Sequence, residues 1–94
     1  MTRIVIKKLI WDSWNSAHIR KRGLSINDVE EAARNMVAHK RARSGRYITI
    51  GRSGRRIISI VVNRLNTGVY YVVTARDSDK KERRIVYQYE KEKK

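Results

Sequence analysis

Three strand-like runs that follow one another within residues 46–76 constrain the fold more than any other feature of the sequence. Each is rich in β-branched or aromatic residues, the composition that favours strands. The runs are Arg46–Arg52, Arg55–Asn63 and Val69–Arg76. Short links, Ser53–Gly54 and Leu65–Gly68, separate them, and links of this kind indicate hairpins. An antiparallel meander is therefore predicted, with the second run at its centre because that run is apolar on both faces apart from Ser59.

The third run ends on an arginine where a charged helix is predicted to begin. Tyr70–Val73 consists only of β-branched and aromatic residues, which is typical of a strand covered on both faces. Arg76 follows where the apolar run stops, so rigid neighbours should hold its guanidinium at the edge of the sheet. Asp79 stands three residues before Glu82, the spacing of a helix N-cap and its reciprocal partner. The helix should run from about Asp79 to Lys91.

Two helices are expected before the meander. Asp12 is a suitable N-cap for a helix over Ser13–Arg22, which should stop at the glycine that follows it. Ser25 opens the second helix, with Asp28 as the partner in a weaker capping box. Apolar residues then recur at helical spacing, and the helix should fade near His39–Arg43. The apolar stripe of this helix comprises Val29, Ala32, Ala33, Met36 and Val37.

With a first strand over Arg3–Ile10, the predicted order is β-α-α-β-β-β-α. This order is typical of a small α+β domain in which an antiparallel sheet carries its helices mainly on one face. A length of 94 residues favours one domain. We assign this domain to residues 1–89 and expect Glu90–Lys94 to be a frayed basic tail.

Composition and charge exclude several classes of protein. The chain has no cysteine, which excludes a disulfide framework and a cysteine-type zinc site. It shows no apolar run long enough for a membrane span and no signal-peptide pattern, so a cytoplasmic location is expected. The net charge is +14, and no acidic residue occurs from Ala32 to Arg76. Such a balance favours a polyanionic partner: nucleic acid, an acidic protein or an anionic membrane surface. The alternative is a basic face that only meets solvent.

The acidic residues near the last helix have two interpretations. Asp77, Asp79 and Glu82 are a local acidic cluster that could bind magnesium through oxygen. They could equally cap the helix and complement its dipole. Five basic residues surround them and would compete with a cation, so we favour capping and expect no metal and no other cofactor. The five are Arg76, Lys80, Lys81, Arg83 and Arg84.

Cleavage of RNA without a metal fits this basic sequence better than other hydrolytic chemistry. RNA supplies its own nucleophile, the 2′-hydroxyl, so the protein needs only to position the backbone, move protons and stabilise charge on the phosphate. Arginines at strand ends suit the last task, and His18, Glu82 or a lysine is a candidate for proton transfer. Trp14, Ala17, His18 and Lys21 share one helical face, and two polar members are unusual for a face that only packs. The aromatic candidates for stacking on bases are Trp14, Tyr70, Tyr71 and Tyr87.

Motifs spread over nearly the whole chain fit one known pattern. They are Trp11–Asp12–x–Trp14–Asn15–x–x–His18–Ile19–x–Lys21–Arg22–Gly23, Val29–Glu30–Glu31, Arg46–Tyr47 with Gly51–Arg52, and Val72–Val73–Thr74–Ala75–Arg76 with Lys81–Glu82–Arg83–Arg84 and Tyr87. This pattern resembles the BrnT-type toxins of bacterial and archaeal toxin–antitoxin modules. The Thr-Ala-Arg…Glu-Arg…Tyr segment is the most specific part of the resemblance.

The resemblance implies a RelE-like α+β fold and ribonuclease activity without a required metal. It also implies a cognate antitoxin, BrnA-like and DNA-binding, which covers the toxin in a hetero-oligomer and represses the operon. By position, Arg52 and Arg76 resemble arginines that bind phosphate or stabilise the transition state. Glu82 is either a base or a structural residue that caps the helix and orients Arg76. The full set of catalytic candidates is Arg52, Arg76, Glu82, Arg83, Tyr87, His18 and Lys21.

One position departs from the pattern. Relatives usually show histidine where this chain has Arg22. If that histidine takes part in catalysis, either His18 or Lys21 replaces it or the activity is weak. The cations expected to contact nucleic acid are Arg22, Arg43, Arg46, Arg55, Arg56 and Lys80. Two other functions remain open: a nucleic-acid-binding module without catalysis, and a protein whose basic surface meets only an acidic partner such as the antitoxin.

Overall fold

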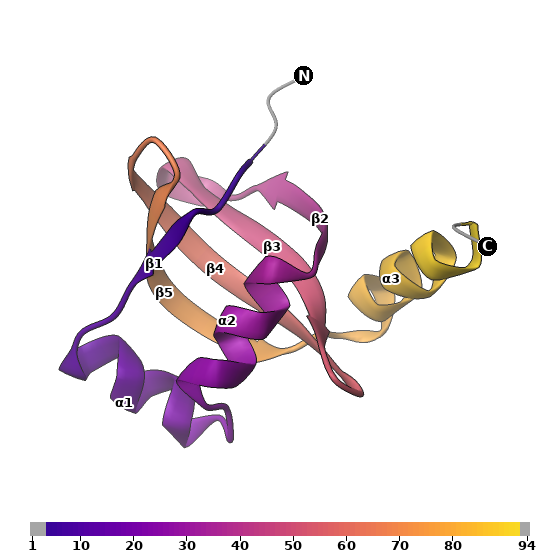
Figure 1. The fold of residues 1–94 in the computed structure, drawn as a ribbon, viewed down its shortest axis with the longest axis horizontal. Coiled ribbons are helices and arrows are strands. Elements are labelled where there is room, and N and C mark those ends of the chain that lie inside the picture. Colours follow the sequence, from indigo (N-terminus) through magenta and orange to yellow (C-terminus); the bar gives the residue numbers. More distant parts are fainter. Residues whose placement is uncertain (1–3, 93–94) are drawn as a thin grey trace.

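The computed structural model describes residues 4–92, which form one five-stranded sheet with three α-helices and a short 3₁₀ turn (Figure 1). In chain order the elements are β1 (Lys8–Ile10), α1 (Ser13–Lys21), α2 (Ile26–Arg34), β2 (Met36–Arg41), η1 (Arg43–Gly45), β3 (Arg46–Ser53), β4 (Arg56–Asn66), β5 (Val69–Asp77) and α3 (Lys80–Glu92). Within the described range, no helix is long and apolar enough to cross a membrane.

The sheet has the strand order β1-β5-β4-β3-β2. Strands β2, β3, β4 and β5 are antiparallel neighbours, whereas the edge strand β1 runs parallel to β5. The predicted α+β class and the meander are confirmed, with β4 at the centre of the sheet. The prediction of one antiparallel sheet misses the parallel pairing of β1. The first strand is also shorter than Arg3–Ile10, and Arg3 lies outside the described residues.

An additional strand occupies the segment that was expected to continue the second helix. Helix α2 ends at Arg34, and the Asn35 backbone N–H caps it by donating to the Glu31 carbonyl. Residues Met36–Arg41 then pair with β3 as β2, with a register shift near its start. Pairing with β3 supplies partners for the backbone groups of this segment, and this tertiary gain outweighs its weak helical preference. The order is therefore β-α-α-β-β-β-β-α.

Two of the three α-helices, α1 and α2, pack on one face of the sheet as predicted, and α3 packs on the other face. Alternate residues of β4, such as Ile58 and Ile60, join Ile19 of α1 and Val29 of α2 in the larger core. Ile57, which precedes Ile58 and points to the opposite face, belongs to a smaller core with Ile50 and Val86 beneath α3. We call these the α2 face and the α3 face of the sheet. Figure 1 shows α2 lying across the sheet and α3 extending beyond its edge.

Two close contacts fix the helices of the α2 face. Asn15 is fully buried and its side-chain N–H groups donate to the carbonyls of Ile10 and Val72, both at 3.0 Å, which ties α1 to β1 and β5. Helix α2 passes so near β3 that a Cβ atom on Gly51 would lie 2.0 Å from the carbonyl oxygen of Ala32. Only glycine fits at that position, because the obstacle is backbone.

Candidate functional site

Arg76 lies at the end of β5 and forms a bidentate pair with Glu82 of α3. Its Nη1 donates to Glu82 Oε1 at 2.7 Å and its Nη2 to Oε2 at 2.9 Å. The Glu82 side chain is only 5% exposed, whereas the Arg76 side chain is 36% exposed. The buried carboxylate of Glu82 therefore fixes one edge of the Arg76 guanidinium, and the rest of the guanidinium is exposed to solvent. This is the fixed arginine that the sequence predicts at the strand end.

Glu82 is held by more than this pair. Its Oε1 also accepts from Ser59 Oγ at 2.9 Å and from the Asp79 backbone N–H at 2.8 Å. Burial alone would raise the pKa of Glu82, but the hydrogen bonds from Arg76, Asp79 and Ser59 outweigh it and lower the pKa to about 2. A carboxylate with so low a pKa is a poor proton acceptor near neutral pH. These contacts favour the structural alternative, in which Glu82 caps α3 and orients Arg76.

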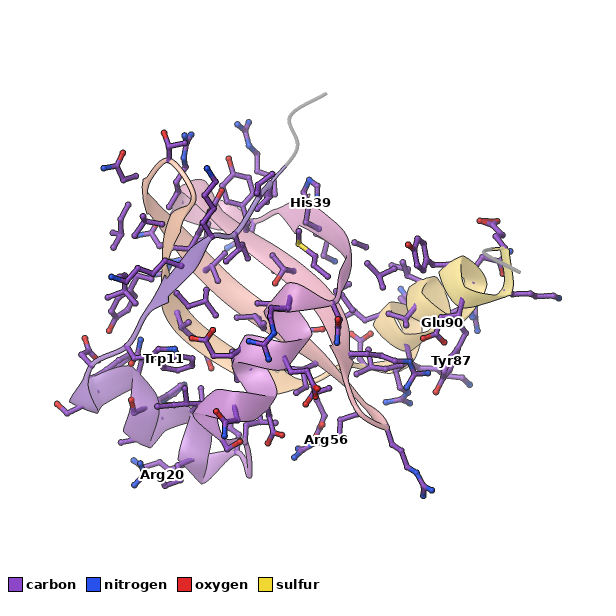
Figure 2. All side chains as sticks on the ribbon, viewed as in Figure 1. Trp11, Arg20, His39, Arg56, Tyr87 and Glu90 are labelled. Carbon is purple, nitrogen blue, oxygen red and sulfur yellow. The ribbon has the colours of Figure 1, made fainter. Side chains whose placement is uncertain are left out.

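Arg52 lies on the same face of the sheet but pairs with a different carboxylate. It forms two hydrogen bonds with the carboxylate of Glu90, one from Nε and one from Nη2, the latter at 3.0 Å. Its guanidinium carbon also lies 5.9 Å from the centre of the Tyr87 ring. The pair with Glu90 raises the pKa of Arg52 and lowers that of Glu90. A phosphate that approached Arg52 would compete with Glu90, which Figure 2 shows beside Tyr87 on α3.

The strand register sets the distance between the two arginines. Arg76 pairs with Ser59, Ser59 pairs with Ile50, and Arg52 lies two residues beyond Ile50. Two strand spacings and two residues correspond to roughly 12 Å between the backbones of Arg52 and Arg76. Helix α3 crosses this gap, with Glu82 near its start at one arginine and Glu90 in its last turns at the other.

Arg83, Tyr87 and Lys80 are exposed residues of α3. They line a surface hollow of about 360 Å³ together with Arg84. Arg83 Nη1 donates to the Ser78 carbonyl at 2.7 Å, which orients its guanidinium at the start of the helix. The predicted residues Arg52, Arg76, Glu82, Arg83, Tyr87 and Lys80 therefore gather around α3.

The acidic residues next to Arg76 have separate structural tasks. Asp79 caps α3, since its Oδ1 accepts from the Glu82 backbone N–H at 2.9 Å. Asp77 pairs with Arg56 through two hydrogen bonds of 3.1 and 3.0 Å, so it is not a cap. Within residues 4–92, no group of three histidine, cysteine or acidic residues is arranged to hold a metal ion.

His18 and Lys21 belong to a different group of residues on α1. The rings of Trp14 and His18 are stacked, with centroids 5.4 Å apart and an interplanar angle of 3°. These two residues and Lys21 line a hollow together with Ser13 and Ala17. Within residues 4–92, His18 and Lys21 form no hydrogen bond or ion pair with Arg76 or Glu82. Their predicted part in proton transfer stays a prediction.

The other predicted nucleic-acid contacts are spread over the surface. Arg22, Arg43, Arg46 and Arg55 are exposed, but Arg46 lies six residues from Arg52 along β3, which places it roughly 20 Å away. Arg56 is an ion-pair partner of Asp77 and Asp28 and also donates to the Gly23 carbonyl, so a structural role accounts for it. Tyr70 is buried against Tyr47, which rules it out as an exposed stacking surface.

Sequence reasoning missed Ser59, Ser78 and Glu90. The two serine hydroxyls lie 2.7 Å apart beneath Glu82, and Ser59 is 1% exposed. The signal for Ser59 was present, because it interrupts an otherwise apolar central strand. Glu90 was assigned to a frayed tail, but α3 continues through it to Glu92 and Glu90 binds Arg52. The domain boundary after residue 89 stays a prediction, and Lys93 and Lys94 of the predicted tail lie outside the described residues.

Comparisons with known proteins identify the fold. The sequence matches no model of a protein family and no curated protein. Among solved structures, the crystal structure of the Brucella abortus ribonuclease toxin BrnT superposes with a TM-score of 0.61. The two sequences are 23% identical, and the match covers 78% of this chain and 97% of that chain. The protein described above therefore has a BrnT-type fold.

Proposed function

We propose that this protein is the toxin of a type II toxin–antitoxin module and that it cleaves RNA without a metal ion. The observation that supports the proposal most directly is Arg76, fixed by buried Glu82 at a strand end, in a fold shared with a ribonuclease toxin. In the proposed reaction the 2′-oxygen of RNA attacks the adjacent phosphorus and the bond to the 5′-oxygen breaks. The 2′-hydroxyl loses a proton and the 5′-oxygen gains one, which leaves a 2′,3′-cyclic phosphate and a 5′-hydroxyl.

Three groups around α3 have distinct tasks in this proposal. Arg76 and Arg83 stabilise the negative charge that grows on the phosphate oxygens, because guanidinium groups bind phosphate in a bidentate way. Arg52 and Tyr87 bind the neighbouring part of the RNA. Glu82 positions Arg76 and does not act as the base, as its low pKa indicates. The substrate is cytoplasmic RNA, and a cognate antitoxin covers the basic surface.

A cleavage assay on a defined single-stranded RNA tests the proposal. In EDTA, the purified protein should cut this RNA and leave cyclic phosphate ends, whereas an oligonucleotide with 2′-deoxyribose at the cleaved position should stay intact. Expression in cells should stop growth, and co-expression with the protein encoded by the neighbouring gene should restore it. RNA binding without cleavage would instead identify a non-catalytic module, and absence of growth arrest together with absence of cleavage would refute the proposal.

Glu90→Gln is expected to strengthen binding of single-stranded RNA. The carboxylate of Glu90 occupies Arg52, and removing its charge frees the guanidinium for one more phosphate. The slope of log K against log salt concentration should therefore steepen by about 0.7. The free energy of unfolding should change little, because the pair is partly exposed and solvent screens it.

Glu92→Gln is the matched control for this prediction. It makes the same change of charge on the same helix, and Glu92 accepts a hydrogen bond from Gln88, not from Arg52. Equal salt slopes for the two variants, measured by fluorescence anisotropy, would mean that Glu90 does not compete with phosphate at Arg52.

A further inference from the structure

Helix α1 presents an aromatic pair to solvent. Trp14 is 63% exposed, and its ring lies almost parallel to that of His18 one turn further on. The other tryptophan differs, because Trp11 is half-buried and its indole N–H donates to Glu30 at 2.8 Å. Within residues 4–92 the Trp14 indole N–H has no hydrogen-bond acceptor. Trp11 thus has a structural task, and the structure gives Trp14 none.

Helix stability does not explain this exposed pair. Side chains four residues apart stabilise a helix only slightly, and a large aromatic ring contributes to folding mainly when it is buried. Asn15 and Ile19 are the buried residues of α1, so the packing of the helix comes from its other side. A contiguous exposed patch marks a binding surface where a single exposed side chain does not, and here the stacked ring of His18 continues the exposed ring of Trp14.

The surroundings of the pair indicate the chemistry of the ligand. Trp14 and His18 line a hollow of about 420 Å³ with Ser13, Ala17 and Lys21. Lys21 follows His18 by three residues, so it lies on the same side of the helix. No acidic side chain lines the hollow. Aromatic rings beside a cation form the pattern with which proteins bind single-stranded nucleic acid: bases stack on the rings and the cation contacts the backbone.

The position of α1 connects the pair to the arginines around α3. The carbonyl of Gly23, just past the end of α1, accepts from Arg56 Nη1 at 3.0 Å. Arg56 in turn pairs with Asp77, the residue that follows Arg76. The end of α1 is thus fixed on the α2 face at the end of β5, while the side chain of Arg76 points to the α3 face of the same strand end. Trp14 lies nine residues before Gly23, roughly 14 Å along the helix.

We propose that the Trp14–His18 pair is a stacking platform for a base of single-stranded RNA, with Lys21 at the adjacent phosphate. The platform binds RNA that flanks the phosphate held at Arg76. It reads no particular sequence, because every base has a π-face. The inference adds a second binding site to the proposed ribonuclease and rests on RNA as its ligand, but not on cleavage.

Tryptophan fluorescence with an RNA that cannot be cleaved tests the platform. In a Trp11→Phe protein, Trp14 is the remaining source of indole emission, and titration with a 2′-O-methyl hexanucleotide should quench it. In the otherwise wild-type chain, Trp14→Leu should weaken binding of the same oligonucleotide roughly 5- to 100-fold, as loss of one stacked base does. Trp14→Phe should retain most of the affinity, since it keeps a ring. An abasic oligomer with the same phosphates should bind the wild-type and Trp14→Leu proteins equally.

The salt dependence of RNA binding distinguishes base stacking on Trp14 from the contact of Lys21 with phosphate. Trp14→Leu should leave the slope of log K against log salt concentration unchanged, whereas Lys21→Gln should make it shallower by about 0.7. Circular dichroism should show the same helix content in each variant, since Trp14 and Lys21 are exposed.

Three results would overturn the platform: no quenching of Trp14, equal affinity of Trp14→Leu for the hexanucleotide, or an equal loss of affinity for the abasic oligomer. If Trp14→Leu lost binding to the co-expressed neighbouring protein and kept its affinity for RNA, the pair would be a protein-docking surface instead. Failure of the proposed function gives a different result, in which RNA binding depends on Trp14 but no RNA is cut.

Discussion

Arg76→Ala is expected to lower the rate of RNA cleavage roughly 100- to 1,000-fold, the cost of removing one preorganised group that stabilises transition-state charge. The loss should appear in kcat, because Arg52, Arg83 and the basic surface still bind RNA. Single-turnover cleavage of a defined RNA, followed by gel electrophoresis, measures the effect. Arg41→Ala, an exposed arginine in the last position of β2, is the matched control and should cut at the wild-type rate.

A second variant separates lost chemistry from lost folding. Arg76→Ala leaves the buried carboxylate of Glu82 without its cation, and breaking such a pair destabilises a protein. The double variant Arg76→Ala with Glu82→Gln removes this unpaired charge and should recover much of the thermal stability. It should remain inactive. Cleavage by the double variant at the wild-type rate would show that Arg76 is not part of the active site.

Glu82→Gln is expected to change how stability depends on pH. The pKa of Glu82 falls from 4.5 to about 2 on folding. Since the folded pKa is the lower one, this group stabilises the protein fully above about pH 4.5 and ceases to do so as the pH falls through 2. The linkage corresponds to about 3 kcal/mol of unfolding free energy. The wild type should therefore exceed the variant by about this amount at pH 7 and by almost nothing near pH 2.

Chemical denaturation at a series of pH values measures this difference. The pKa values of Asp12, Asp28 and Glu90 are lowered as well, so the wild type loses stability in acid for several reasons. The quantity to follow is the difference between wild type and Glu82→Gln, from which those contributions cancel. A difference that stays constant from pH 7 to pH 2 would contradict the network of hydrogen bonds described for Glu82.

Local signals in the sequence predicted most of the fold. The capping residues Asp12, Ser25 and Asp79 each begin the helix that they were expected to begin. The predicted hairpin between β3 and β4 forms, with its two-residue turn at Gly54–Arg55, one residue later than Ser53–Gly54. Strand β2 was not predictable in the same way. Its first residues continue the helical periodicity of α2, and what makes them a strand is pairing with β3, a partner later in the chain.

The candidate site also contains one pair that local sequence signals indicated and one that only long-range packing creates. The pair of Arg76 and Glu82 is six residues apart, and the spacing of Glu82 from Asp79 already indicated a fixed carboxylate near the strand end. The pair of Arg52 and Glu90 is 38 residues apart, and only the packing of α3 on the sheet brings them together. The charged residues around Glu90 indicated a solvated tail. In the structure Glu90 instead belongs to α3 and pairs with Arg52.

The attachment of α3 has a consequence for native-state dynamics. One apolar side chain, Val86, and one carboxylate, Glu82, are the buried side chains of this helix. An element with so little buried apolar area opens at a lower free energy than the sheet beneath it, as a cooperative unit. Because α3 supplies the carboxylates for both Arg52 and Arg76, each opening uncovers two guanidinium groups at once. Opening of α3 thus removes the carboxylate partners of both arginines at the same time, although the two arginines are not in contact.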